Sequence, residues 1–146
     1  RKTSLDRRMD RQDSFCMSIP LDIENLEDAL SEYGMNPYLI TTDNEAHPHI
    51  THVTLSKDSA GYVCGLGRKT SANALERPSV ALLWPPLTQD SHSLIVDGVI
   101  EVIETQEGPQ GRIAPKAAIL HRPAVKEDTD QNCDSDCHSI TMDKER

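Results

Sequence analysis

The chain has 146 residues, of which 36% are hydrophobic, and a formal net charge of −9. This length suits one domain with its own core, and the acidic balance argues against a general nucleic-acid binder, which needs excess cations. No apolar stretch approaches the roughly 20 residues that span a bilayer, and no basic segment followed by an apolar run indicates a secretory signal. We therefore expect a soluble, cytoplasmic protein that binds neither nucleic acid nor membrane.

The two ends of the chain differ from its middle. Residues 1–16 and 126–146 are rich in charged side chains and lack an apolar period. Such composition cannot offset the entropy cost of ordering, so we predict disorder at both ends and one folded domain over residues 17–125. The chain begins with Arg1 rather than methionine, and we interpret residues 1–16 as an upstream extension.

The acidic tail contains a short cluster of metal-binding residue types. Cys133, Cys137 and His138 form a C-x3-C-H pattern. A structural zinc site usually takes four ligands, commonly in two pairs held apart by folded chain. Because this cluster stands alone, we favour a solvated or disulfide-capable tail, and we expect no metal.

The first folded element is expected to be a short amphipathic helix that begins after Met17. Asp22 is placed to cap the helix and Gly34 to end it. Its apolar residues are spaced three to four apart, at Ile23, Leu26, Ala29 and Leu30.

The remainder reads as short strands separated by turn residues. The segments expected to be strands are residues 38–42, 49–56, 62–67, 79–84 and 93–104. The first two are expected to form a hairpin, and Gly98 predicts a bulge or bend in the last. A short helix is expected over residues 70–77, ended by Pro78, whereas residues 111–124 are compatible with either helix or strand. One helix, several strands and a small inserted helix predict a mainly β protein, a barrel or sandwich with a few helices.

A small-residue turn followed by two cations resembles a phosphate site. Arg68 and Lys69 follow Gly65 and Gly67 and precede the expected helix, whose free N–H groups favour anions. The spacing matches neither the P-loop nor the dinucleotide fingerprint, because Arg68 separates Gly67 from Lys69 and Thr70 stands where the third glycine would be. The alternative is a solvated, charged turn, and the residues alone leave both interpretations open.

The stretch GRKTSANALERPSVALLWPP, residues 67–86, resembles the pyridoxamine 5'-phosphate oxidase-like, FMN-binding split-barrel family. Upstream, the Ala-x-Pro-His-x-x-x-Val run at residues 46–53 is similar to the first hairpin of that family. Downstream, the segments WPP, LIVDG, LHRPA and CDSDC are similar to actinobacterial members. The resemblance covers roughly residues 20–125 and depends on the order of the motifs more than on any single one.

The resemblance implies a homodimer of split β-barrels with FMN or a deazaflavin in the groove between the subunits. Matching positions would hold the cofactor phosphate through Arg68 and Lys69, supported by Thr70 and Asn73. The residues that would line the isoalloxazine ring are Thr51, His52, Val53 and Thr54. The extra basic residues with which vitamin B6 oxidases bind their substrate are absent, so we do not expect pyridoxamine phosphate oxidation.

The histidines, Cys64 and Trp84 are interpreted here without a role in catalysis or metal binding. His47 and His49 are expected on one strand face and His52 on the other, which cannot converge on one metal without a bulge. Cys64 lies in an apolar run and is expected to be a buried, inert thiol. Trp84 is expected to be a packing anchor at a strand end.

Three functions remain open. The first is a flavin- or deazaflavin-dependent oxidoreductase that acts on a small organic substrate, with hydride transfer carried by the cofactor and no identifiable catalytic side chain. The second is a non-catalytic protein that binds or stores flavin, deazaflavin or haem on the same scaffold. The third is a structural role with an empty groove. The acidic tail of a deazaflavin needs extra cations, which favours FMN, whereas the actinobacterial segments favour deazaflavin.

Overall fold

The computed structural model describes residues 17–124. The predictions of disordered ends, and the cluster of Cys133, Cys137 and His138, lie outside the described residues. No helix within the described part is long and apolar enough to cross a membrane.

The described chain is built on one eight-stranded sheet in which all pairs are antiparallel. The strand order is β3-β2-β6-β7-β8-β5-β4, and β1 pairs with β8 beside this path. The expected mainly β fold is therefore confirmed. The strands are β1 (Ser18–Leu21), β2 (Tyr38–Thr42), β3 (Pro48–His52), β4 (Ser56–Asp58), β5 (Gly61–Gly65), β6 (Ser79–Trp84), β7 (Ser93–Thr105) and β8 (Gly108–His121).

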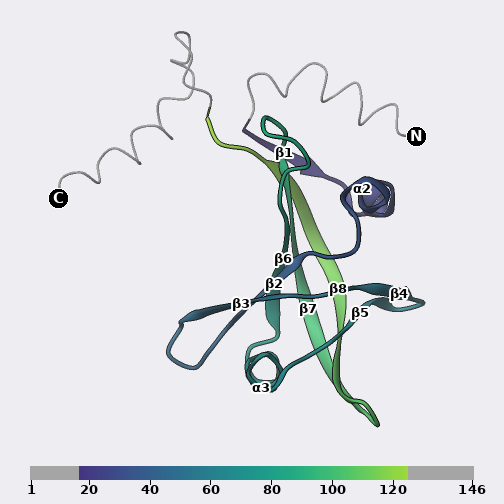
Figure 1. Cartoon of the computed structure of the whole chain (residues 1–146), viewed down its shortest axis with the longest axis vertical. Coiled ribbons are helices and arrows are strands. Elements are labelled where there is room, and N and C mark those ends of the chain that lie inside the picture. Colours follow the sequence, from purple (N-terminus) through teal and green to yellow (C-terminus); the bar gives the residue numbers. More distant parts are fainter. Residues whose placement is uncertain (1–16, 125–146) are drawn as a thin grey trace, which may run out of the picture.

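The two outermost strands of this order are joined directly along the chain, as the ribbon from β3 to β4 shows in Figure 1. The linking residues are tied to an irregular segment rather than to a strand. The Val53 N–H donates to Pro37 O at 3.0 Å and the Leu55 N–H donates to Met35 O at 2.8 Å. The expected strand over residues 49–56 is therefore wrong in its extent, because β3 ends at His52 and the chain bends across to β4.

The predicted first helix is present as the 3-10 turn η1 (Ile23–Asn25) and α2 (Leu26–Tyr33). Gly34 ends it with φ 90°, and its N–H donates to Leu30 O at 2.9 Å. The prediction for Asp22 is wrong: its side chain makes no capping bond, and its carbonyl oxygen instead accepts the Asn25 N–H at 2.9 Å.

Strand pairs between residues far apart in the sequence determine the structure at both ends of the domain. β1 was not expected, yet Ile19 and Leu21 are buried and the strand pairs with the end of β8. Residues 111–124, which the sequence left open, belong mostly to β8, which pairs with β7 along its whole length. The expected bulge is confirmed by a register shift between Asp97 and Gly98.

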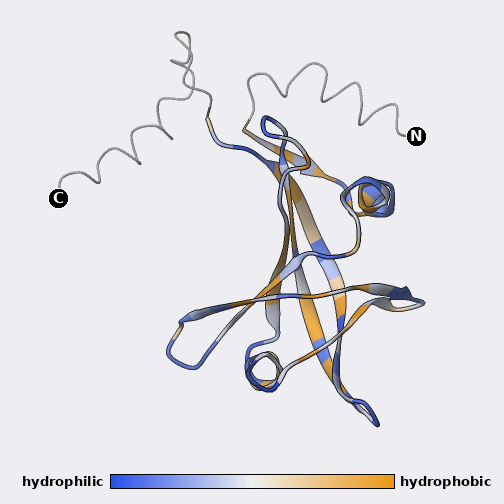
Figure 2. Ribbon diagram, in the orientation of Figure 1, coloured by the Kyte–Doolittle hydropathy of each residue, from blue (hydrophilic) through white to orange (hydrophobic). Residues whose placement is uncertain are grey.

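Alternate residues of the strands fill the core. Hydrophobic stretches of the strands are orange in Figure 2. Trp84 is 2% exposed, and its Nε1–H donates to Gly34 O at 2.8 Å, so its predicted role as a packing anchor is confirmed. Cys64 is a free, buried thiol, and burial raises its pKa to about 11. The reactive thiolate is therefore scarce at neutral pH, as expected for an inert cysteine.

Candidate functional site

The helix that follows the two cations is α3 (Arg68–Glu76), which begins two residues before the expected Thr70. Gly67 is the N-cap residue in an extended conformation, and no side chain caps this end. The first backbone hydrogen bond, from Ser71 N–H to Gly67 O, spans 2.9 Å. Arg68 and Lys69 therefore lie in the first turn of a helix whose N–H groups have no side-chain acceptor, an arrangement that favours an anion.

Lys69 lies beside the turn that joins β2 and β3. Its Nζ is 4.0 Å from Asp43 Oδ2, and both Arg68 and Lys69 are exposed. Asp43 Oδ1 accepts the backbone N–H groups of His47 and Glu45, each at 2.9 Å, and these bonds lower the pKa of the carboxyl group. Asp43 is thus anionic near neutral pH and holds Lys69 close to the turn. Arg68 has no acidic partner within residues 17–124.

One face of α3 is buried, with Thr70, Ser71, Asn73 and Ala74, whereas Ala72 and Leu75 are exposed. Thr70 is 2% exposed and Asn73 is 4% exposed. The Asn73 Nδ2–H donates to Thr41 Oγ1 at 3.0 Å, which anchors α3 to the end of β2. The amide nitrogen of Asn73 therefore already has a hydrogen-bond partner within the protein. Contacts of Thr70 and Asn73 with a ligand remain predictions.

The contribution of the Asn73–Thr41 hydrogen bond to stability can be measured against a variant of a neighbouring residue. We expect Thr41→Val to lower the free energy of unfolding by about 1–3 kcal/mol, because the Asn73 amide loses its acceptor while remaining buried. The matched control is Thr42→Val, whose half-buried hydroxyl makes no hydrogen bond within the described residues. Urea denaturation measures both variants. Equal destabilisation would contradict an anchoring role for the Thr41 hydroxyl.

The β2–β3 hairpin has a core face and an open face. The core face carries Leu39 and Thr41, and the register places Thr51 and His49 directly opposite them. The Thr51 Oγ1 is buried and has no hydrogen-bond partner within the described residues. Buried hydroxyls are nearly always paired, so this atom is a candidate contact for a polar ligand group.

Side chains of neighbouring residues in a strand point to opposite faces. His52 and Thr54, two of the four residues predicted to line the isoalloxazine ring, therefore lie on the open face. His52 lies opposite Tyr38, and the two rings stack with centroids 4.4 Å apart and an angle of 16°. Thr54 is exposed, and its Oγ1 accepts a 2.7 Å hydrogen bond from Asn36 Nδ2. Val53 is buried in the core. The four predicted residues therefore do not share one surface: Thr51 and Val53 are buried at least in part, whereas His52 and Thr54 face outward.

The three histidines of this hairpin do not form a metal centre. His49 and His52 lie on opposite faces of β3, as expected. His47 is in the preceding turn, where its Nδ1 lies 3.6 Å from Asp43 Oδ2 and 3.8 Å from Glu45 Oε1. No group of three or more metal-ligating side chains exists within residues 17–124.

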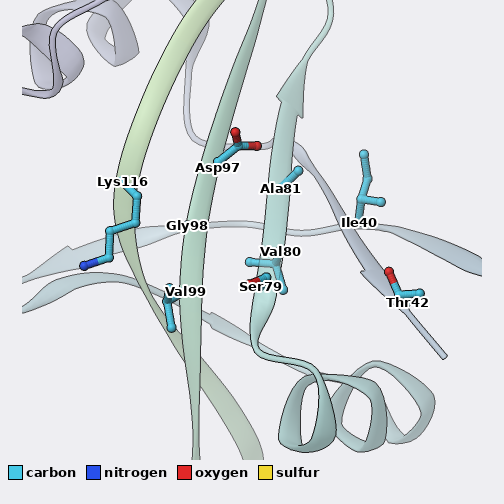
Figure 3. Close-up of a pocket in the computed structure, with 9 residues that line it drawn as sticks. All are labelled: Ile40, Thr42, Ser79, Val80, Ala81, Asp97, Gly98, Val99 and Lys116. Carbon is cyan, nitrogen blue, oxygen red and sulfur yellow. The ribbon is translucent and has the colours of Figure 1, made fainter. Parts of the chain in front are cut away.

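The open face also contains a groove of about 480 Å³ (Figure 3). Exposed apolar side chains occur on this face, with Ile50 60% and Val99 41% exposed. Sequence reasoning missed the groove, although apolar residues at the outward positions of β2, β3 and β7 were a signal for it. The lining comes from β2, β6, β7 and β8: Ile40, Thr42, Ser79, Val80, Ala81, Asp97, Gly98, Val99 and Lys116.

Comparisons with known proteins give relatives and a fold. No family model matches the chain. An uncharacterized protein of Mycobacterium bovis is 31% identical over 134 residues, an alignment that covers 80% of this chain and 92% of that protein. A protein of Mycobacterium tuberculosis, also uncharacterized, matches to the same extent.

Three solved structures share the fold. A putative pyridoxamine 5'-phosphate oxidase from Listeria innocua has a TM-score of 0.55 at 15% identity and covers 68% of this chain and 98% of that one. The haem storage protein HutZ from Vibrio cholerae has a TM-score of 0.54 at 13% identity, with coverage of 68% and 93%. An F420 reductase has a TM-score of 0.51 at 15% identity, with coverage of 62% and 94%.

Proposed function

We propose that the chain, which shares the fold of a putative pyridoxamine 5'-phosphate oxidase and an F420 reductase, belongs to the pyridoxamine 5'-phosphate oxidase-like, FMN-binding split-barrel family and is an oxidoreductase with a flavin-type cofactor. Its eight-stranded antiparallel sheet, with α2 and α3, is the split-barrel fold. The substrate is proposed to be a small organic molecule that gains or loses a hydride. We propose that one domain, residues 17–125, carries this activity.

The start of α3 carries this proposal. An uncapped helix N-terminus with exposed Arg68 and Lys69 fits a phosphate monoester, because the dipole, the N–H groups and two cations all favour negative charge at one place. Arg68 would donate two parallel hydrogen bonds and Lys69 would add a point charge. Thr70 and Asn73 would support this turn from the buried side, where Asn73 is already bonded to Thr41.

The hairpin is proposed to bind the remainder of the cofactor. The partnerless Thr51 hydroxyl fits a polar atom of a ribityl chain or ring, and the segment Thr51, His52, Val53 and Thr54 would line the isoalloxazine ring through its backbone and outward side chains. A bound flavin supplies hydride transfer, whereas the protein supplies binding and orientation.

FMN is favoured over a deazaflavin by the distribution of cations. A deazaflavin carries an additional acidic tail, which needs further positive groups. Lys57 pairs with Glu27 at 3.2 Å and the Arg112 Nη2 pairs with Asp58 Oδ2 at 3.0 Å. The Arg77 Nε–H donates to Thr42 O at 2.7 Å. These three cations already have partners, which leaves Lys116 and Arg122 as the other cations of the described residues.

We propose that the functional unit is a homodimer. The open face exposes Ile50 and Val99 around the groove, and a second copy of the chain would remove this apolar surface from water. The cofactor would then lie between the subunits, as the family resemblance implies. We propose the cytoplasm as the compartment.

A second candidate function is the non-catalytic storage of haem or a flavin. The structural similarity to HutZ, a haem storage protein, favours it. The two functions differ in turnover. A storage protein would bind its cofactor without cycles of reduction and reoxidation, whereas an oxidoreductase would pass electrons to an acceptor.

A parallel titration tests the proposal. The purified chain is titrated with FMN, a deazaflavin and riboflavin, followed by fluorescence, and with haem, followed by absorbance. We expect saturable FMN binding at micromolar or lower concentration. Haem binding alone would favour storage, and binding of none of the four would contradict a cofactor site at the start of α3.

A further inference from the structure

The turn between β2 and β3 places a carboxylate beside the start of α3. One of its oxygens, Asp43 Oδ2, lies 3.6 Å from His47 Nδ1 and 4.0 Å from Lys69 Nζ. His47 comes from the turn itself, whereas Lys69 belongs to the first turn of α3, next to Arg68. The same oxygen atom therefore has two cationic neighbours when His47 is protonated and one when His47 is neutral.

Backbone hydrogen bonds fix the position of the Asp43 carboxylate. Its other oxygen, Oδ1, accepts the N–H groups of His47 and Glu45 at 2.9 Å each, and these bonds lower the pKa of the carboxyl group. The Asp43 side chain is 20% exposed, compared with 70% for His47. Asp43 therefore keeps its charge at neutral pH, while the imidazole of His47 is open to water and can exchange a proton.

The other charged or titratable groups near His47 come from its own hairpin and from the end of α3. Glu45 Oε1 lies 3.8 Å from His47 Nδ1, and its side chain is 73% exposed. His49 follows two residues later on β3 and is half-buried. Arg77, the residue after α3, donates from Nε to Thr42 O at 2.7 Å. Within the described residues no ion pair joins any of these groups to the first turn of α3, so the turn acts on that helix through Asp43.

We propose that protonation of His47 strengthens anion binding at the start of α3, which rests on the proposed phosphate site for a flavin-type cofactor. When His47 is neutral, the Asp43 carboxylate attracts Lys69 and repels a phosphate bound beside it. When His47 takes up a proton, the imidazolium balances Asp43, and Lys69 interacts with the phosphate instead. His47 is thus a positioning residue that acts through Asp43 and does not need to touch the ligand.

The exposure of these side chains limits the size of the effect. Ion pairs between exposed groups change an equilibrium by up to about fivefold, and histidine ordinarily changes its charge between about pH 5 and 8. The contribution of His47 to FMN affinity is therefore expected to be present at the acidic end of this range and absent at the basic end. Because binding free energies are reciprocal, FMN binding should in turn favour uptake of a proton by His47.

The test compares the FMN affinity of the wild type and His47→Gln at about pH 6 and about pH 8.5, by fluorescence titration at low salt. The phosphate of FMN itself changes charge near pH 6, but the ratio of the two affinities cancels this contribution because both chains meet the same ligand. We expect the wild type to bind FMN about three- to fivefold more tightly than His47→Gln at the lower pH, and equally well at the higher pH. Riboflavin, which lacks the phosphate, should bind both chains equally at both pH values.

Two further variants make the test specific. His121→Gln is the matched control, because His121 is also exposed but pairs with Ser18 of β1, at the opposite end of the molecule from α3 (Figure 1). It should behave like the wild type at both pH values. Asp43→Asn retains an oxygen that accepts the two N–H groups of the turn but carries no charge, so it should bind FMN about three- to fivefold more tightly than the wild type at the higher pH.

The outcomes separate this inference from the proposed function. If the wild type binds FMN no better than riboflavin at either pH, the phosphate site is overturned and this inference with it. If the wild type prefers FMN but its affinity ratio to His47→Gln is the same at both pH values, only the role of His47 is overturned. Weaker FMN binding by Asp43→Asn at the higher pH would also overturn it, because Asp43 would then support the site rather than compete with the phosphate.

Discussion

Replacing Arg68 and Lys69 together with alanine is expected to weaken FMN binding by about 100-fold or more. Each hydrogen bond to a charged group contributes about 1.5–3 kcal/mol, and both side chains are exposed, so the low end of this range applies to each. Riboflavin has the same ring and ribityl chain without the phosphate. Its affinity is therefore expected to change little in the double variant.

The ratio of FMN to riboflavin affinity is the measurement that isolates the phosphate. Fluorescence titrations give both constants for the wild type, for each single variant and for the double variant. Lys57→Ala is the matched control, because Lys57 is also exposed but lies on β4, where its Nζ is 3.2 Å from Glu27 Oε2. An equal loss for FMN and riboflavin would mean that the two cations hold something other than the phosphate.

The single variant Lys69→Ala carries further information. Because the Lys69 Nζ lies 4.0 Å from Asp43 Oδ2, part of its charge is already balanced in the free protein. Arg68 has no such partner within the described residues. We therefore expect Arg68→Ala to cost more FMN affinity than Lys69→Ala, and salt to weaken binding to the wild type more than to the Arg68 variant.

Gly61→Ala is expected to lower the free energy of unfolding by about 3 kcal/mol, at the upper end for overpacking, because rigid backbone is the obstacle. Gly61 has φ 156°, and a Cβ there would lie 2.5 Å from the backbone oxygen of Ile113. That oxygen belongs to β8, which pairs with β5 at this point. The strands would have to separate, and the barrel would lose hydrogen bonds at the β5–β8 contact.

Gly65→Ala is the matched control in the same strand. A Cβ at Gly65 meets no heavy atom within 4 Å, so we expect a change within about 0.5 kcal/mol. Urea denaturation followed by the fluorescence of Trp84, the single tryptophan, measures both variants. Similar free energies for the two variants would contradict a close approach of β8 to Gly61.

The local elements were predictable from the sequence because their signals lie within a few residues. Apolar residues three to four apart predicted α2, and alternation with turn residues between predicted the β2–β3 hairpin. Gly34 ended the helix and Gly98 marked the bulge, since glycine tolerates a positive φ and close backbone approach. Arg68 and Lys69 could be identified as a candidate phosphate site from the sequence alone.

Only the tertiary structure decided how these elements meet. β1 is four residues long and becomes a strand only because β8, about a hundred residues later, provides its partner. The same holds for the groove, whose lining comes from four strands. Burial of Asn73 against Thr41 and the separation of Thr51 from His52 follow from packing and register. Such contacts join residues far apart in sequence, and their free energy depends on the whole sheet rather than on any short segment.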